Sequence, residues 1–421
     1  MQLMPEAFPE DQDLWSDFKA LCEFGGRLTG TPSEVASRNW AADRLGQLGL
    51  GHLTRKPVAY TGWACSEAKL QLAATSEPLE ATALLCSGDT PSGGLELEVI
   101  DCGRGTPDDI KAVGDRLRGR AALVRHDYMF ATTTVHRRVK LAAAIEAGAA
   151  AFLIAASEQG IGSVSGSSGL VDSTRRIPAL GISAEAAEKL SIPGARVRIV
   201  VAAAFEPQAT TETISLDIPG AGPGRIVLSA HIDGHAAGAS ALDNASGVAL
   251  ALALARQAAP HISGCPRGLT IAIFSAEEWA LTGSKEWLKG LAGSEQRRMA
   301  LNVNLDTVVG GSRLTALTSD YPRLVSFLSD AAQSAGIPLG VYEPLMPNSD
   351  HANFAAFGIP AFRLVSGFDE PGSNCRLVLT SHDQSNLVRK DDFNEPAHLA
   401  WSILRAALTQ PDETLESLRE R

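Results

Sequence analysis

Short apolar runs and stretches of helical periodicity alternate regularly from about residue 206 to the C-terminus. Such runs predict strands, and apolar residues at every third or fourth position predict helices. Strands are predicted at 213–218, 225–232, 269–276, 300–308, 313–319 and 359–366, and helices at 245–259, 281–291, 321–335 and 394–408. Largely apolar runs such as LTIAIF and ALNVNL are typical of central strands covered on both faces. The pattern predicts an α/β sandwich, in which ligands bind outside the carboxyl ends of the strands.

The first half of the chain has a different pattern of apolar and polar residues. Residues from about 14 to 50 have helical periodicity around a turn, GGRLTGTPS, and 57–74 are predicted to be extended. From 77 to 205, short apolar runs separated by Gly and Pro flank helical segments at 134–149 and 184–190. This favours a small β-rich domain with one or two covering helices. We therefore divide the chain into 1–76, an inserted domain at 77–205, and 206–421.

Length, charge and cysteine content limit the class of protein. The 421 residues exceed the roughly 100–200 residues of one ordinary domain. A formal net charge of -11 argues against a nucleic-acid partner, which requires basic patches. The acidic start MQLMPEAFPEDQDLW is unlike a signal peptide, and Glu and Gly interrupt the longest apolar run, 141–156, so no membrane span and a cytoplasmic location are expected. The six Cys show no C-x-x-C spacing, which favours reduced, buried thiols.

Ionisable side chains stand where the predicted strands end. One strand ends in HID, the next in EE, and a third in a single Asp, while a loop and a segment near the C-terminus add one residue each. The set is His231, Asp233, Asp243, Glu277, Glu278, Asp306 and His382. Burying such charges at the end of an apolar strand costs several kcal/mol unless they are paired or bind a metal. Three successive strands that end this way predict a functional site.

The residue types indicate which chemistry the site performs. Histidine nitrogen and carboxylate oxygen form a hard-to-borderline ligand set, which suits zinc, cobalt or manganese. Glu277, the first of two adjacent glutamates, is then available as a base, because neighbouring residues at a strand end point in different directions. Two cations about 3.5–4 Å apart, bridged by a carboxylate, are the arrangement used for metal-assisted hydrolysis.

The motifs in this order resemble the M28 family of co-catalytic zinc peptidases with an inserted protease-associated (PA) domain. The matching stretches are HID (231–233), GASALDNASG (238–247), FSAEEWALTGS (274–284), NLDT (304–307), SDHANFAAFGIPA (349–361) and SH (381–382). The segments GGRLTGTPSEVASRNWAADRLGQLGL, GRAALVRH and KLAAAIEAGAAAFLIAAS also resemble the family. The nearest likeness is to carboxypeptidase Q-like dipeptidases and PA-containing aminopeptidases.

This resemblance implies a three-layer sandwich with a mixed, mostly parallel sheet, and two Zn²⁺ per chain, with Co²⁺ or Mn²⁺ as substitutes. His231 and Asp306 would hold one zinc, Glu278 and His382 the other, and Asp243 would bridge them. Glu277 would act as general base and acid. Asp233 would orient His231 by a hydrogen bond to its second nitrogen. A cis peptide is implied between Asp243 and Asn244.

Some positions depart from the family or have competing interpretations. A Tyr commonly precedes the last His in the family, and Ser381 stands there instead. The segment after His382 is about one residue shorter than usual. His351 is the main rival of His382 as a ligand, although its motif favours a position lining the pocket. His235 is predicted to be a loop residue near the entrance rather than a ligand.

The leading hypothesis is a di-zinc exopeptidase that acts on short peptides, with the removal of an N-terminal residue as its main reaction. A dipeptidase or carboxypeptidase would use the same site and would need an Arg for the substrate carboxylate; the candidates are Arg363, Arg376 and an Arg of the inserted domain. A glutaminyl cyclase-like acyltransferase and a non-catalytic interaction module are weaker alternatives. The sequence leaves the side-chain preference open, and also whether the chain acts as a monomer or a homodimer.

Overall fold

A computed structural model describes residues 4–170 and 175–420 of the chain. The contacts divide it into two compact units, each described by itself below. Unit 1 comprises Met1–Ala59, Thr210–Cys375 and Asp383–Arg421, and unit 2 comprises Tyr60–Ala209 and Arg376–His382. The chain passes between the units within two long strands, β1 (His52–Leu72) and β8 (Arg196–Ile218).

The sheet of unit 1 has the strand order β13-β12-β14-β11-β9-β10-β8. The pairings β10–β9, β9–β11, β11–β14 and β12–β13 are parallel, whereas β12–β14 and β10–β8 are antiparallel. The strands are β9 (Arg225–His231), β10 (Gly268–Phe274), β11 (Met299–Leu305), β12 (Leu314–Leu317), β13 (Leu339–Tyr342) and β14 (Ala361–Ser366). β9, β10, β11 and β14 are buried almost throughout, as expected for strands covered on both faces. Unit 1 therefore has the predicted α/β fold with a mixed, mostly parallel central sheet.

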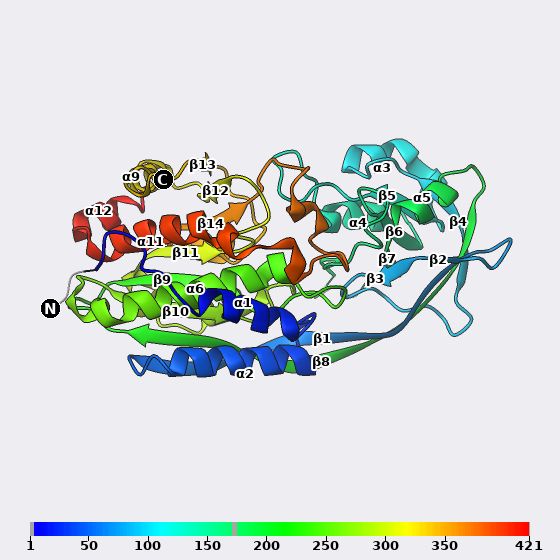
Figure 1. Ribbon diagram of the computed structural model, residues 1–421. Helices are drawn as coiled ribbons and strands as arrows, with labels where there is room; N and C mark the ends of the chain where they lie inside the picture. Colours follow the sequence, from blue (N-terminus) through cyan, green and yellow to red (C-terminus); the bar gives the residue numbers. More distant parts are fainter. Residues whose placement is uncertain (1–3, 171–174, 421) are drawn as a thin grey trace. The chain divides into compact units, whose positions relative to one another are not determined.

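Helices cover this sheet. They are α1 (Leu14–Glu23), α2 (Pro32–Gly46), α6 (Ser246–Ala258), α7 (Thr282–Lys289), α8 (Gly293–Arg298), α9 (Pro322–Ala335), α10 (His351–Ala356), α11 (Asn394–Thr409) and α12 (Asp412–Ser417). In Figure 1, α1, α6 and α11 lie together on one side of the strands, and α6 packs directly on β9 and β11. Trp287 of α7 and Phe354 of α10 join Phe274 of β10 in an apolar cluster. This packing fixes the strand ends from which the site is built.

Unit 2 is built around a smaller sheet. Strands β4 (Leu95–Asp101), β5 (Ala121–Arg125), β6 (Ala151–Ala155) and β7 (Ala179–Ile182) pair in parallel in that order, while β3 (Ala81–Ala83) and β8 pair antiparallel at the two edges. The short strand β2 (Pro78–Leu79) pairs with β1. The helices are α3 (Pro107–Val113), α4 (Arg137–Glu146) and α5 (Ala184–Leu190). Apolar residues from these strands and α5 form a core of their own.

Most predicted elements of unit 1 are present, with boundaries shifted by a few residues. β13, α8, α10 and α12 were not predicted, because each has only four to six residues, too few to show a periodicity. The helix predicted at 281–291 begins at Thr282, since Leu281 has a left-handed backbone with φ 60°. All six Cys are free thiols, as expected, and all but Cys65 are buried.

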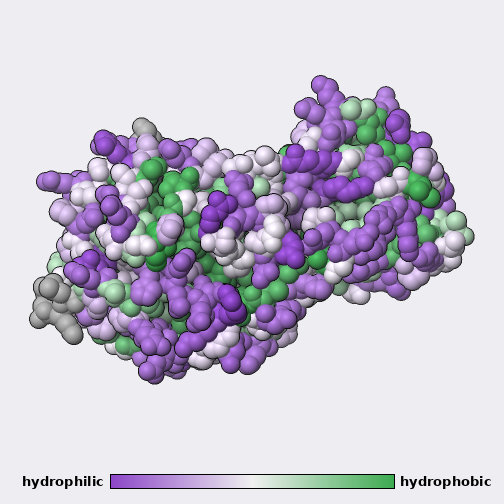
Figure 2. All heavy atoms as spheres, turned by 45° about the horizontal axis from the view of Figure 1, so that its top comes forward, coloured by the Kyte–Doolittle hydropathy of each residue, from purple (hydrophilic) through white to green (hydrophobic). Residues whose placement is uncertain are grey.

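The surface is mainly hydrophilic on the face shown in Figure 2, where apolar residues show chiefly in recesses between polar ones. Within the described ranges, no helix combines the length and the apolar character that crossing a membrane requires.

Candidate metal centre

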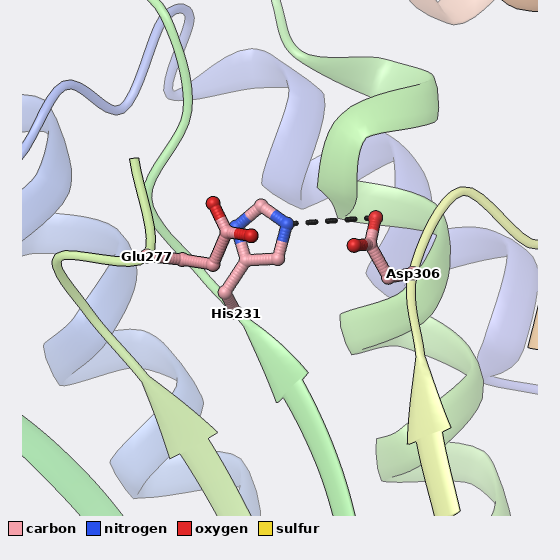
Figure 3. Close-up of side chains that lie close together, drawn as sticks. All are labelled: His231, Glu277 and Asp306. Atoms are coloured by element: carbon pink, nitrogen blue, oxygen red, sulfur yellow. Dashed lines mark ion pairs between the residues drawn. The ribbon is translucent and has the colours of Figure 1, made fainter. Parts of the chain in front are cut away.

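The predicted ionisable residues of three strands meet at one edge of the unit 1 sheet. β10, β9 and β11 are parallel neighbours, so their carboxyl ends lie side by side. His231 is the last residue of β9, Glu277 follows β10, and Asp306 directly follows β11. Figure 3 shows these three side chains converging from the three strand ends. All three are buried, so a buried polar cluster lies at the carboxyl ends of these strands.

His231 is the centre of a first group of ligand atoms. Its Nε2 lies 3.1 Å from Oδ1 of Asp243 and 3.6 Å from Oδ1 of Asp306. Two ligands of one tetrahedral zinc, each about 2.0–2.1 Å from the metal, are separated by about 3.3 Å. Among the described residues, this buried Nε2 has no partner with hydrogen-bond geometry. The donor types and separations therefore fit a divalent metal ion held by His231, Asp243 and Asp306.

Glu277 lies beside this group. A carboxylate oxygen of Glu277, a nitrogen of His231 and an oxygen of Asp306 all lie within 4.8 Å of one another. Burial raises the pKa of Glu277 well above its usual range; His231 opposes this shift, and Glu278, Asp350 and Asp306 add to it. The position suits a base next to a metal and is also within reach of direct ligation, an alternative that the sequence did not raise.

A second group of possible ligands lies next to the first. It consists of His235, Asp243 and Glu278, whose ligand atoms lie within 4.8 Å of one another. Nε2 of His235 is 2.5 Å from Oε1 of Glu278, and both side chains are buried. Asp243 thus lies near His231 of the first group as well as near His235 and Glu278, and its bridging of two metals stays a prediction.

His382 belongs to neither group. Its side chain is exposed, its backbone N donates to Oγ1 of Thr380 at 3.2 Å, and it is counted with unit 2. Its assignment as a ligand stays a prediction. Ser381 is also exposed, whereas His351 is the buried first residue of α10.

Asp233 connects two strand ends. Its carboxylate accepts hydrogen bonds from the backbone N of Glu277 and of Glu278, both at 3.1 Å, and from Oγ1 of Thr29 at 2.9 Å. Nδ1 of His231 is 3.1 Å from the backbone O of Asp233 and 3.7 Å from its carboxylate, so the carbonyl is the nearer partner. Asp233 thus positions the backbone of both glutamates, a contact that strand periodicity does not reveal.

The loop that carries Asp243 is held by its own amide groups. The peptide between Asp243 and Asn244 is cis, which confirms the expectation from the resemblance. The side-chain amide of Asn244 donates to the backbone O of Leu305, and its oxygen accepts from the N of Gly247 and of Thr307. These bonds join the loop to the end of β11, next to Asp306.

Two further residues that the sequence did not single out hold the same loop. Arg27 is fully buried and donates to five backbone carbonyls: those of Leu21, Ile232, Ala239 and Ser240 at 2.8–3.1 Å, and that of Gly25 at 3.3 Å. Asp383, which follows His382, accepts from the backbone N of Leu242 and Asp243, and its own carbonyl accepts from the N of Ala239. An Arg in a glycine-rich turn was the only sign in the sequence, and it indicated nothing by itself.

Arg363 is bound to Asp306. Its Nη2 lies 3.1 Å from Oδ1 of Asp306 and donates to Oγ1 of Thr307, and its Nε donates to the backbone O of Asp306. Burial would raise the pKa of Asp306, but Arg363 and then His231 outweigh it and hold that pKa well below the usual range. Arg363 therefore keeps Asp306 ionised and fixes the orientation of its carboxylate.

Buried carboxylates outnumber buried cations around the site. Burial raises the pKa of Asp350 to about 7 and of Asp383 to about 7, while Asp243, Asp306, Glu277 and Glu278 share the same strand ends. Burial would lower the pKa of His231, yet the carboxylates, Glu277 first, raise it well above its usual range. Carboxylates this close to one another disfavour each other's ionised form unless cations offset their charge. The electrostatics thus support divalent metal ions here.

Comparison with known proteins agrees with this fold and site. Residues 213–401 match the model of peptidase family M28, and residues 80–190 match the PA domain. An α/β domain with candidate metal ligands at its strand ends and an inserted PA domain defines a class of metallopeptidase. Residues 213–401 form a domain of peptidase family M28, and residues 80–190 form a PA domain.

Two solved structures share the fold over nearly the whole chain. One is BSAP, a zinc aminopeptidase from Bacillus subtilis, with a TM-score of 0.77 at 22% identity over 97% of each chain. The other is the aminopeptidase of Aneurinibacillus sp. strain AM-1, with a TM-score of 0.71 at 24% identity, covering 96% of this chain and 95% of that one. Leupeptin-inactivating enzyme 1 of Streptomyces exfoliatus is 28% identical over 162 residues, which are 38% of this chain and 37% of that protein. The chain thus matches little more than a third of that relative's length.

Proposed function

We propose that this protein is a two-metal exopeptidase that removes N-terminal residues from short peptides. The observation that carries the proposal is the position of Asp243: its Oδ1 lies 3.1 Å from Nε2 of His231, and its carboxylate also lies within 4.8 Å of ligand atoms of His235 and Glu278. A carboxylate shared by two ligand groups is the arrangement of two-metal hydrolytic sites. Two Zn²⁺ per chain are the proposed cofactors, with Co²⁺ or Mn²⁺ as substitutes.

Bound divalent cations would polarise the scissile carbonyl and make an attacking water more acidic. The chain's own residues do the rest. Glu277 accepts the proton of the attacking water and delivers it to the leaving amine. Asp233 holds the backbone of Glu277 in place, and Arg363 keeps Asp306 ionised. The sequence assigns the nitrogen ligand of the second metal to His382, and the structure offers His235 as well.

An aminopeptidase fits better than a carboxypeptidase because the two arginines that the sequence named individually are already engaged. Arg363 is buried against Asp306, and Arg376 pairs with Glu158 at 2.7 Å. The surplus of carboxylates suits a substrate's cationic amino terminus and repels a free carboxylate. Two proteins that share the fold, the zinc aminopeptidase BSAP and the aminopeptidase of Aneurinibacillus sp. strain AM-1, support the same choice.

A substrate panel tests this function. Aminoacyl-nitroanilides and free dipeptides should be hydrolysed, N-acetyl dipeptides should not, and a chelator should abolish activity that added Zn²⁺ restores. Hydrolysis of N-acetyl dipeptides without hydrolysis of nitroanilides would favour the carboxypeptidase. One metal per chain together with cyclisation of N-terminal Gln would favour the glutaminyl cyclase-like alternative. Activity that survives exhaustive chelation would contradict the metal mechanism itself.

Arg363→Lys separates the two roles considered for this arginine. Because Arg363 supports the ligand Asp306, we expect the affinity for the first zinc to fall by about 10–100-fold, as for loss of a partner behind a metal ligand. At saturating Zn²⁺, kcat/KM for a peptide and for its C-terminal amide should change by the same factor. A loss confined to the peptide with a free carboxylate would show instead that Arg363 binds substrate.

A further inference from the structure

We propose that His235, and not His382, supplies the nitrogen ligand of the second metal, together with Asp243 and Glu278. One short loop, from His231 to Asp243, would then carry a histidine for each metal and the carboxylate between them. The inference rests on the proposed two-metal function and specifies which residues build its second site.

The ligand atoms are already gathered in the structure. His235 has only 4% of its surface exposed, and its Nε2 faces Oε1 of Glu278 at 2.5 Å. Within the described part of the chain, this Oε1 is buried and has no partner with hydrogen-bond geometry. The side chains of His235 and Glu278 are both buried. A cation held between these two groups and Asp243 would stabilise the buried carboxylates more fully than the histidine alone.

The backbone around His235 is fixed on both sides. Its N donates to Oγ of Ser240 at 3.0 Å, and the N of the preceding Gly234 donates to the backbone O of Arg27 at 3.0 Å. Its carbonyl lies so close to Gly26 that a Cβ added there would be 2.1 Å from the oxygen. Only glycine at position 26 allows the backbone of His235 to come this close. The contacts on both sides therefore hold the imidazole in place beside Glu278. Ligands of a metal site need this kind of support.

His382 lacks these features. Its side chain is exposed, and its ligand atoms belong to neither group that could hold a metal. The two assignments predict opposite results when the second metal is titrated into variants of His235 and His382. Each variant therefore serves as the control of the other.

Metal binding to the full-length chain tests the inference without relying on activity. Metal-free wild type, His235→Ala, His235→Cys and His382→Ala are titrated with Zn²⁺ by calorimetry, and the metal content after gel filtration is measured by mass spectrometry. Wild type and His382→Ala should bind two ions. His235→Ala should keep the first ion and bind the second at least about 100-fold more weakly. Loss of a residue that only supports a ligand lowers metal affinity by about 10–100-fold, so a larger loss indicates a ligand. His235→Cys, whose thiolate can still ligate zinc, should recover much of the loss.

Cobalt adds a spectroscopic readout. The visible absorption of the second Co²⁺ bound should change in His235→Ala and stay unchanged in His382→Ala, because only a ligand alters the coordination of the ion. Equal thermal unfolding temperatures of metal-free wild type and His235→Ala establish that the variant is folded. If the temperatures differ, recovery of the second metal in His235→Cys shows whether the lost affinity is due to the missing ligand. A wild-type affinity for both ions in His235→Ala, or loss of the second ion in His382→Ala, would overturn the assignment. Wild type that binds one ion would instead overturn the two-metal function, and the assignment with it.

Discussion

Replacing Glu277 by glutamine is expected to lower kcat by about 10²–10⁴-fold while the protein keeps its metal ions. The amide has nearly the same shape as the carboxylate but cannot accept the proton of the attacking water. The first metal is expected to remain, because Asp243 and Asp306 both have an oxygen within 3.6 Å of Nε2 of His231 without help from Glu277. Steady-state kinetics on an aminoacyl-nitroanilide, with metal content measured on the same sample, check both parts.

Glu278→Gln is the matched control for this prediction. The two glutamates are adjacent, both are buried, and both have a backbone N bound to Asp233. If Glu278 is the ligand and Glu277 the base, only Glu278→Gln should weaken the second metal. Loss of the first metal in Glu277→Gln would show that Glu277 is itself a ligand, which its position beside His231 and Asp306 allows.

The sheet and most of the site could be predicted because both follow from local patterns. A buried strand shows as an apolar run, and the residue that ends it shows as an ionisable interruption. His231, Glu277 and Asp306 come from three such strands, which the structure confirms as parallel neighbours. No pattern along the chain specifies that order of strands. That the three side chains converge was inferred from the general rule that ligands bind outside the carboxyl ends of the strands in α/β sheets and, more specifically, from the family resemblance.

The residues around the loop could not be predicted because they depend on contacts distant in sequence. His235 looked like a spare loop residue, since its neighbour Glu278 is 43 positions away along the chain, after a helix and a strand. Asp383 contacts Leu242 across 141 positions. Arg363 stood out as a charge within an apolar strand, but only the β11–β14 pairing places it beside Asp306 rather than facing a substrate.

Replacing Arg27 by methionine should have the largest effect on stability. Methionine fills much of the same volume and removes the cost of burying a charge, which the lowered pKa of Arg27 reflects. It also removes one donor from each of four buried carbonyls, of which that of Ser240 keeps a hydrogen bond from the N of Ala245. Each unsatisfied buried polar group costs about 1–3 kcal/mol, so we expect a net loss of about 3–5 kcal/mol in the free energy of unfolding.

Urea unfolding of the metal-free protein measures this loss, and Arg55→Met provides the comparison. Arg55 is partly exposed and pairs with Glu212 at 2.7 Å, so its removal should cost no more than about 1 kcal/mol. Three of these four buried carbonyls, those of Ile232, Ala239 and Ser240, lie in the segment that joins β9 to α6. Arg27→Met should therefore also speed hydrogen exchange across residues 231–247 and weaken Zn²⁺ binding. Equal destabilisation by the two variants, with exchange in 231–247 unchanged, would mean that the metal loop holds its shape without Arg27.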